Sequence, residues 1–230
     1  MSKKTIVVVG ASRGIGKATV ELLAQHSEFS IYALSRDLAK MQTNFNALPN
    51  VYCYAFDLSQ NVRQQAELIF SECTQIDYII NNAGKLVNKP FTEILHSDLI
   101  DCYQTNVIGV METVQAVVPK MIQKGGHIVN ISSIGGFQGS VKFGGLSAYS
   151  TSKAAVCSFT ELFAEEYKES PIKINCLCLG AAQTEMLNEA FPGYEAPVSA
   201  EKMAEYIVDF TLTAHEWMNG KIIPVSLSTP

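Results

Sequence analysis

Residues 5–16 read Thr-Ile-Val-Val-Val-Gly-Ala-Ser-Arg-Gly-Ile-Gly, an apolar run of strand length that leads directly into a glycine-rich loop. The run has the β-branched composition of a strand buried on both faces. Glycines at positions 10, 14 and 16 permit a tight turn and a close approach of the backbone to a ligand. A helix that starts in such a loop presents free N–H groups and a positive dipole end. The stretch therefore predicts a strand–loop–helix unit that binds phosphate groups.

The glycine spacing is G-x-x-x-G-x-G, which differs from the dehydrogenase fingerprint G-x-G-x-x-G. A plain glycine-rich turn is the alternative interpretation of the loop taken alone.

The same alternation of apolar runs and amphipathic segments continues along the chain. We expect strands at Thr5–Val9, Phe29–Leu34, Val51–Phe56, Tyr78–Asn81, His127–Ile131, Ile172–Leu179 and Lys221–Val225. We expect helices at Gly14–His26, Leu38–Asn46, Ser59–Cys73, Leu99–Gln123, Ala148–Lys168 and Ala200–Leu212. Pro119 should kink its helix or close its last turn. Repeated strand–helix units predict an α/β fold: a Rossmann-type, doubly wound parallel sheet of about seven strands with helices on both faces.

Composition limits the class of protein. The 230 residues are 47% apolar and 17% charged, with no linker-like interruption, which favours one domain over residues 1–230. The net charge of −5 offers no basic field for nucleic acid or for an anionic membrane. The basic start and apolar run at the N-terminus resemble a signal peptide, but the run ends in the phosphate loop, so a strand is the better interpretation. No segment reaches transmembrane length.

The six cysteines predict neither disulfides nor a metal site. They are scattered and lack zinc-site spacing. Cys176 and Cys178 are two residues apart in an expected strand and should face the same side. We interpret the cysteines as small buried side chains in a reducing cytoplasm, and we expect no metal.

Tyr149 and Lys153 are four residues apart in an expected helix, so they share one face. A positive charge beside a phenol favours the phenolate and lowers the pKa of the tyrosine from its usual value of about 10. Such a tyrosine can act as a general acid or base. Beside a dinucleotide loop, the pair indicates hydride transfer coupled to proton transfer.

The end of the second strand indicates which nicotinamide cofactor binds. An acidic residue there binds the ribose 2′-hydroxyl of NAD, whereas arginine accommodates the 2′-phosphate of NADP. Here Ser35 takes the acidic position, Arg36 follows it, and Arg13 lies in the loop. Two guanidinium groups and a hydroxyl suit a phosphate dianion, so we expect NADP(H). Solvated arginines with Asp37 on a ribose hydroxyl are the alternative.

With these motifs in order, the chain resembles the short-chain dehydrogenase/reductase family over essentially its whole length. The motifs that carry the resemblance are Gly10–Gly16, Asp57-Leu58, Asn81-Asn82-Ala83-Gly84, Asn106, Ile131-Ser132-Ser133 and Tyr149-x-x-x-Lys153. The resemblance implies a catalytic set of Asn106, Ser133, Tyr149 and Lys153. It implies cofactor-binding positions at Gly10, Ser12, Arg13, Gly14, Ile15, Gly16, Ser35, Arg36, Asp57, Leu58, Asn82, Ala83, Gly84, Tyr149, Lys153, Gly180 and Thr184.

The resemblance also implies a role for each catalytic residue. Tyr149 would be the acid/base at the substrate oxygen, and Lys153 would lower its pKa and bind the nicotinamide ribose. Ser133 would hydrogen-bond the substrate oxygen, while Ser132 would be structural. Asn106 would hold a water that links Lys153 to solvent.

The remaining binding positions have implied roles too. Asp57 and Leu58 would contact the adenine, and residues 82–84 would line its ribose. Thr184 would bind the carboxamide. The chain departs from the family pattern at Leu179, which replaces a proline before Gly180, and in a short substrate lid at residues 185–199.

The leading hypothesis is an NADPH-dependent reductase of a small-molecule carbonyl compound. The alternatives are a catalytically idle NADP-binding regulator and an NAD-dependent alcohol dehydrogenase. A thioester-linked substrate would call for basic residues at the mouth of the site, where only Lys85 and Lys142 are candidates, so we favour a free ketone or diketone. By resemblance, the helices at Leu99–Gln123 and Ala148–Lys168 would form the interface of a homodimer or homotetramer.

Overall fold

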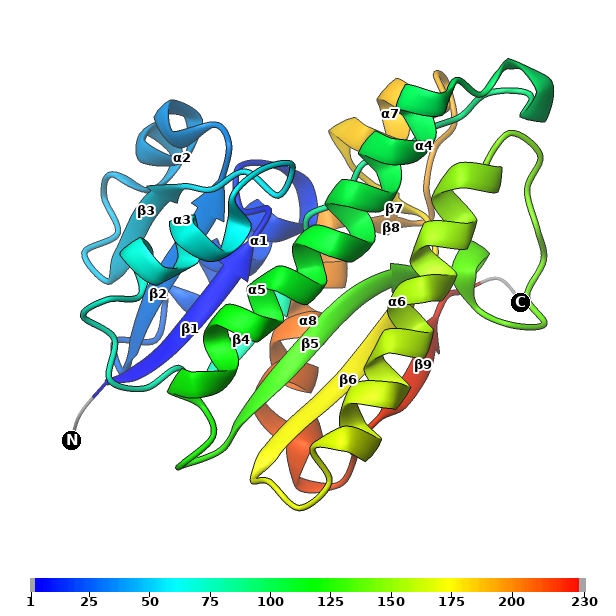
Figure 1. Cartoon of the computed structure of the whole chain (residues 1–230). Coiled ribbons are helices and arrows are strands. Elements are labelled where there is room, and N and C mark those ends of the chain that lie inside the picture. Colours follow the sequence, from blue (N-terminus) through cyan, green and yellow to red (C-terminus); the bar gives the residue numbers. More distant parts are fainter. Residues whose placement is uncertain (1–2, 228–230) are drawn as a thin grey trace.

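A seven-stranded parallel sheet forms the centre of the computed structural model, which describes residues 3–227 (Figure 1). Residues 1–2 and 228–230 of the expected domain lie outside that range. The strand order is β3-β2-β1-β4-β5-β6-β9. Their bounds are β1 Lys4–Val9, β2 Phe29–Ser35, β3 Val51–Ala55, β4 Tyr78–Asn81, β5 Gly126–Ser133, β6 Ile172–Leu179 and β9 Lys221–Val225. All seven expected strands and their parallel pairing are confirmed.

Helices cover both faces of the sheet, as expected from right-handed crossovers. The principal ones are α1 Gly14–Leu23, α2 Leu38–Phe45, α3 Val62–Ile69, α4 His96–Tyr103, α5 Gly109–Val117, α6 Ser147–Glu166 and α8 Ala200–Thr213. Alternate residues of β1 enter two separate cores. Ile6 and Val8 pack with α1, α2 and α8, whereas Val7 and Val9 pack with α3, α5 and α6. Because both faces are buried, the strands read as continuous apolar runs.

One expected helix, Leu99–Gln123, is not continuous. It divides into α4, a π-helical turn at Gln104–Ile108, α5, and a 3-10 turn at Val118–Lys120 that contains Pro119. A Cβ on Gly109 would lie 2.7 Å from the Leu58 carbonyl oxygen, so glycine lets α5 approach this loop. Pro119 closes the last turn, which is one of the two outcomes expected for it.

Sequence periodicity misses the small elements at residues 182–199, the segment expected to be a lid. Strands β7 Ala182–Gln183 and β8 Val198–Ser199 pair in parallel, and helix α7 Glu185–Ala190 lies between them. Two-residue strands are too short to show a period. Further 3-10 turns lie at Phe91–Glu93, Ile134–Gly136 and Ala214–Glu216. Within residues 3–227, no helix combines the length and the apolar character that crossing a membrane requires.

Candidate active site

The predicted site residues meet at the carboxyl ends of the parallel strands. The chain reverses its direction of strand addition between β1 and β4, and in open α/β sheets a crevice for ligands forms at such a point. Gly10 follows β1 and Asn82 follows β4. The Asn82 Nδ2 donates to the Gly10 carbonyl oxygen at 3.1 Å. The two loops expected to bind the cofactor are therefore joined directly.

The glycines of the phosphate loop are required by its geometry. Gly10 has φ +86° and Gly14 has φ +52°, both in the left-handed region that favours glycine. A Cβ on Gly10 would lie 2.6 Å from the Ala83 Cα, and one on Gly16 would lie 2.0 Å from the Gly10 carbonyl oxygen. Ile15 packs against the core at the start of α1. The loop is thus drawn tightly against β4, and its residues fit a dinucleotide phosphate cradle.

The residues expected to surround the 2′-phosphate are only partly brought together. Ser35 Oγ donates to Ser12 Oγ at 2.9 Å, and Asn44 Nδ2 donates to the Ser12 carbonyl oxygen at 3.1 Å. Arg36 is exposed directly after β2. Arg13, in contrast, is ion-paired with Glu189 of the lid.

Asp37, the alternative ribose ligand, accepts from the Lys40 backbone N at 2.9 Å and so caps α2. An aspartate at this position of a helix start is a common structural cap.

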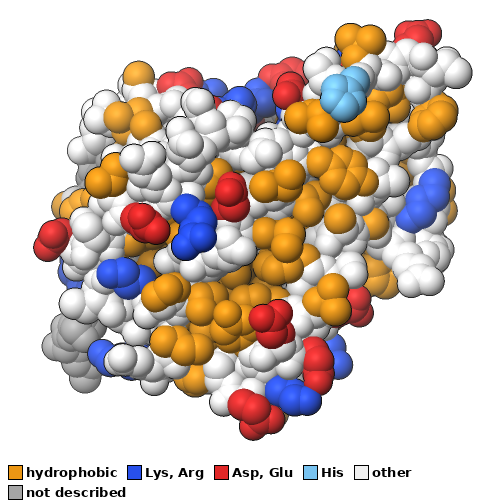
Figure 2. Space-filling view, in the orientation of Figure 1, with side chains coloured by type: hydrophobic (Ala, Val, Ile, Leu, Met, Phe, Trp, Pro, Cys, Tyr) orange, Lys and Arg blue, Asp and Glu red, His pale blue; other side chains and the backbone are white. Residues whose placement is uncertain are grey.

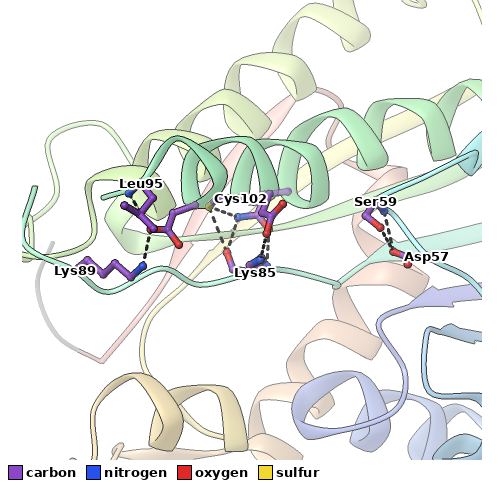
Figure 3. Close-up of polar contacts among 9 residues, drawn as sticks. Asp57, Ser59, Lys85, Lys89, Leu95 and Cys102 are labelled. Carbon is purple, nitrogen blue, oxygen red and sulfur yellow. Dashed lines mark hydrogen bonds and ion pairs between the residues drawn. The ribbon is translucent and has the colours of Figure 1, made fainter. Parts of the chain in front are cut away.

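The residues expected at the adenine lie on the neighbouring loop after β3. The Asp57 carboxylate accepts from the Ser59 backbone N at 2.9 Å and from the Ser59 hydroxyl at 2.7 Å (Figure 3). Leu58 is buried against Gly109 of α5. Asp57 is therefore already held by its own loop, while Ala83 and Gly84, on the loop after β4, are partly buried.

Lys153 lies in α6 beside a small space left by Gly84. Its Nζ donates to the Ile131 carbonyl oxygen at 2.9 Å, and the side chain is buried. A Cβ on Gly84 would lie 3.3 Å from the Lys153 Nζ and 3.5 Å from the Asn106 Oδ1. The absence of a side chain at position 84 thus brings the lysine and the asparagine to the same small cradle. Burial lowers the pKa of Lys153.

Tyr149 corrects one expectation. Burial raises the pKa of its phenol to about 12, although the Ser133 hydroxyl acts in the opposite direction by hydrogen bonding. The predicted lowering of the Tyr149 pKa by Lys153 is therefore wrong. Desolvation of the phenolate is the main cause, and the Lys153 ammonium donates its hydrogen bond to a backbone carbonyl.

The adjacent serines at the end of β5 have different surroundings. Ser132 is buried and its Oγ donates to the Lys153 carbonyl oxygen at 2.8 Å. Ser133 is only partly buried, and its Oγ accepts from the Gly135 backbone N at 3.2 Å. Successive side chains of a strand point to opposite sides, so only one of the two can face the crevice. Ser132 ties α6 to the sheet, while Ser133 contacts Tyr149.

Asn106 is completely buried in the π-helical turn. Its Oδ1 accepts from the Lys85 backbone N at 2.7 Å, and its Nδ2 donates to the Lys85 carbonyl oxygen and to Ser152 Oγ, each at 2.9 Å. Such π-helical turns recur at functional sites. The sequence places Asn106 in a helix but contains no signal for the turn that holds its amide against residue 85.

Gly180 and Thr184 lead from β6 to the lid. A Cβ on Gly180 would lie 2.6 Å from the Ser226 Oγ, so this turn is closely packed. Thr184 Oγ1 accepts from the Leu187 backbone N at 3.2 Å and thereby caps α7. The structure therefore gives the threonine a role as a helix cap, and its contact with the carboxamide stays a prediction.

A cysteine cluster that the sequence did not reveal lies beneath α6. The Sγ atoms of Cys157, Cys176 and Cys178 all lie within 4.8 Å of one another, and all three residues are buried. Cys176 and Cys178 do face the same side of β6, as predicted. The partner Cys157 comes from α6, and no local pattern could have identified it. Its Sγ lies 3.4 Å from the Lys153 carbonyl oxygen.

Comparisons with known proteins agree with this geometry. The family model described as short chain dehydrogenase matches residues 4–195. Carbonyl reductase family member 4 of Danio rerio is 34% identical over 184 residues, which cover 78% of this chain and 76% of that protein. The 3-oxoacyl-[acyl-carrier-protein] reductase of Mus musculus is 32% identical over 187 residues, or 80% of this chain and 77% of that protein.

Solved structures give the same fold. A short chain dehydrogenase from Salmonella enterica serovar Typhi superposes with a TM-score of 0.86 at 25% identity, covering 97% of this chain and 96% of that one. A putative short chain dehydrogenase from Escherichia coli CFT073, complexed with NADPH, gives a TM-score of 0.87 at 23% identity, with 97% of both chains covered.

Proposed function

The chain belongs to the short-chain dehydrogenase family of oxidoreductases, and from this membership we propose that it is an NADPH-dependent reductase of small-molecule ketones or diketones. The observation that supports the proposal is the proximity of four side chains. Ser133 hydrogen-bonds Tyr149, the Lys153 ammonium lies 5.9 Å from the centre of the Tyr149 ring, and Lys153 and Asn106 both border Gly84. A protein that only bound the cofactor would have no need for all four.

Each residue has a part in carbonyl reduction. When bound, NADPH supplies the hydride. The Tyr149 hydroxyl delivers a proton to the substrate oxygen, and the Ser133 hydroxyl stabilises charge that develops there. Lys153 holds the nicotinamide ribose and supports the proton transfer, while Asn106 shapes the route from Lys153 to solvent. The elevated pKa of Tyr149 keeps the phenol protonated, which suits a proton donor.

Purified protein mixed with NADPH and a panel of ketones, diketones and quinones tests the reductase activity through the absorbance of the reduced nicotinamide. NADPH oxidation by the wild type that is lost in Tyr149→Phe, with NADPH binding intact, supports the proposal. Turnover that survives in Tyr149→Phe contradicts the mechanism. Tight NADPH binding with no oxidation across the panel favours the idle regulator.

Preference for NADP(H) is supported by the positions of Ser35 and Arg36 at the end of β2. Arg36 is exposed and carries a charge suited to a phosphate dianion. Arg36→Glu should shift the preference toward NADH, measured as the ratio of Kd values for the two cofactors. Arg63→Glu, an equal change of charge at an exposed position on α3, is the control. An unchanged ratio in Arg36→Glu would contradict the assignment of Arg36 to the 2′-phosphate.

The charges around the site favour a free substrate over one linked to an acidic carrier protein. Lys85 and Lys89 extend from one loop toward α4, where their Nζ atoms pair with Asp101 at 2.5 Å and with Asp98 at 2.6 Å (Figure 3). Lys142 Nζ donates to the carbonyl oxygens of Gly135 and Phe137 at 3.0 and 2.6 Å. These lysines are therefore engaged within the chain. We accordingly place the substrate among free carbonyl compounds, although one relative is named for an acyl-carrier substrate.

We propose a homodimer or homotetramer because apolar side chains are exposed on the face formed by α5 and α6. Figure 2 shows hydrophobic side chains gathered over the middle of the face on which α5 and α6 lie in Figure 1. Exposed members include Ile108, Met111 and Leu162. Light scattering of wild type and of Leu162→Glu tests the assignment, because an unpaired charge should weaken an interface at this position. A monomeric wild type would contradict it.

A further inference from the structure

Arg13 of the phosphate loop and Glu189 of the lid helix form a two-pronged ion pair. Arg13 Nη1 donates to Glu189 Oε1, and Arg13 Nη2 donates to Glu189 Oε2 at 3.1 Å. The two residues are 176 positions apart in the chain. Such a bidentate pair uses the N–H edge of the guanidinium that a phosphate would also use. One arginine cannot bind both anions in this manner at once.

The ion pair is one of several contacts that hold the lid across the crevice. At the start of α7, a Cβ on Gly14 would lie 3.1 Å from the Thr184 Cγ2, so the lid begins in contact with the phosphate loop. At the end of α7, Asn88 Nδ2 donates to the Ala190 carbonyl oxygen at 2.9 Å. Helix α7 is thus attached to the loops that follow both β1 and β4, the strands that flank the crevice.

The charges around Glu189 are those that a 2′-phosphate requires. Arg13 and then Lys40 lower the pKa of the Glu189 carboxyl. Lys40 lies in the first turn of α2, which begins directly after Arg36 and Asp37. Glu185 of the lid also acts on Arg13. The Glu189 carboxylate therefore lies in a cationic site built from the same segments that the proposed function assigns to the phosphate.

We propose that Glu189 occupies the cationic site of the cofactor's 2′-phosphate in the cofactor-free protein, so that this phosphate must displace it and thereby release α7 from the phosphate loop. The inference rests on the proposed NADP(H) preference and adds a specificity-determining residue to it. NADH lacks the 2′-phosphate and leaves the ion pair in place. Glu189 accordingly makes release of the lid depend on the phosphate that distinguishes the two cofactors.

The probe that tests the competition is 2′,5′-ADP, with 5′-ADP as the ligand that lacks the 2′-phosphate. Calorimetry on Glu189→Gln should show about two- to fivefold tighter binding of 2′,5′-ADP than the wild type, the range that an exposed ion pair supports, and unchanged binding of 5′-ADP. The control Glu195→Gln removes the same charge from an exposed position of the lid and should change neither affinity. High salt should reduce the difference between wild type and Glu189→Gln.

Amide exchange provides a second readout. With 2′,5′-ADP, exchange in α7 should rise in the wild type, whereas in Glu189→Gln it should already be high without ligand. Weaker binding of 2′,5′-ADP to Glu189→Gln, or an equal gain for 5′-ADP, would overturn the proposal. If the wild type binds 2′,5′-ADP no more tightly than 5′-ADP, the NADP(H) preference itself fails. If it prefers 2′,5′-ADP but Glu189→Gln changes nothing, only the inference about Glu189 fails.

Discussion

The Lys153 ammonium lies 5.9 Å from the centre of the Tyr149 ring, and its hydrogen bond goes to the Ile131 carbonyl oxygen. One turn of α6 brings the two side chains together, as the spacing in the sequence requires. Proximity alone does not couple them, because the lysine is oriented by the end of β5 and the phenol is desolvated. The site therefore holds a neutral tyrosine beside an ammonium that donates to a backbone carbonyl.

The cofactor-free protein should keep Tyr149 protonated well above neutral pH. Its pKa is raised to about 12 because burial disfavours the phenolate. Difference absorbance between the wild type and Tyr149→Phe should show no phenolate from this residue between about pH 7 and pH 10. A phenolate signal in that range would mean that Lys153 dominates the titration after all.

Ser132→Ala should mainly lower stability, whereas Ser133→Ala should mainly lower turnover. Removal of the buried Ser132 hydroxyl deprives the Lys153 carbonyl oxygen of its 2.8 Å donor, so the free energy of unfolding should fall by about 1–2 kcal/mol. Ser133→Ala should leave stability nearly unchanged and lower kcat by roughly 10²–10³, as expected for loss of an oxyanion donor. Chemical denaturation and steady-state kinetics of both variants make the comparison. Equal loss of kcat in the two variants would contradict the distinct roles.

Gly16→Ala should disrupt the phosphate loop. The new Cβ would lie 2.0 Å from the Gly10 carbonyl oxygen, which is backbone and cannot move independently of β1. We expect destabilisation of several kcal/mol, in the range of overpacked cores, together with loss of NADPH binding. Gly144→Ala is the matched control, because a Cβ there meets nothing within 4 Å. Thermal unfolding of the two variants would contradict the prediction if they melted alike.

His127 should make stability depend on pH. The buried ring has both nitrogens engaged: Nδ1 is 2.9 Å from the Thr211 carbonyl oxygen, and Nε2 is 2.9 Å from the Asn175 Nδ2. Burial, with a smaller contribution from His215, lowers the pKa of His127 from 6.5 to about 4. As the folded-state value is the lower one, the unfolded chain takes up the proton first when the pH falls. This group therefore costs stability between about pH 6.5 and pH 4, by as much as about 3 kcal/mol.

Urea unfolding at pH values above and below 6.5 measures this dependence. His127→Gln removes the titrating group and should flatten the decline, whereas the exposed His26→Gln should leave it as in the wild type. The same decline in wild type and in His127→Gln would assign the effect to other groups.

Much of the fold was predictable because it depends on local patterns. Apolar runs predicted the seven strands, glycine spacing predicted the phosphate loop, and four-residue spacing predicted that Tyr149 and Lys153 share a helix face. The π-helical turn around Asn106 was not predictable, since it arises from a close approach between Gly109 and Leu58 and from amide bonds to Lys85. The two-residue strands beside the lid were likewise too short to leave a pattern.

The strands, the residues of the candidate site and the family could all be identified from the sequence. Periodicity and motif spacing are properties of neighbours along the chain. The electrostatic state of the site, in contrast, depends on how the chain folds. The pairing of Arg13 with Glu189, the direction of the Lys153 ammonium and the raised pKa of Tyr149 depend on groups that are distant in sequence. They depend also on desolvation, which exists only after the chain has folded around these side chains.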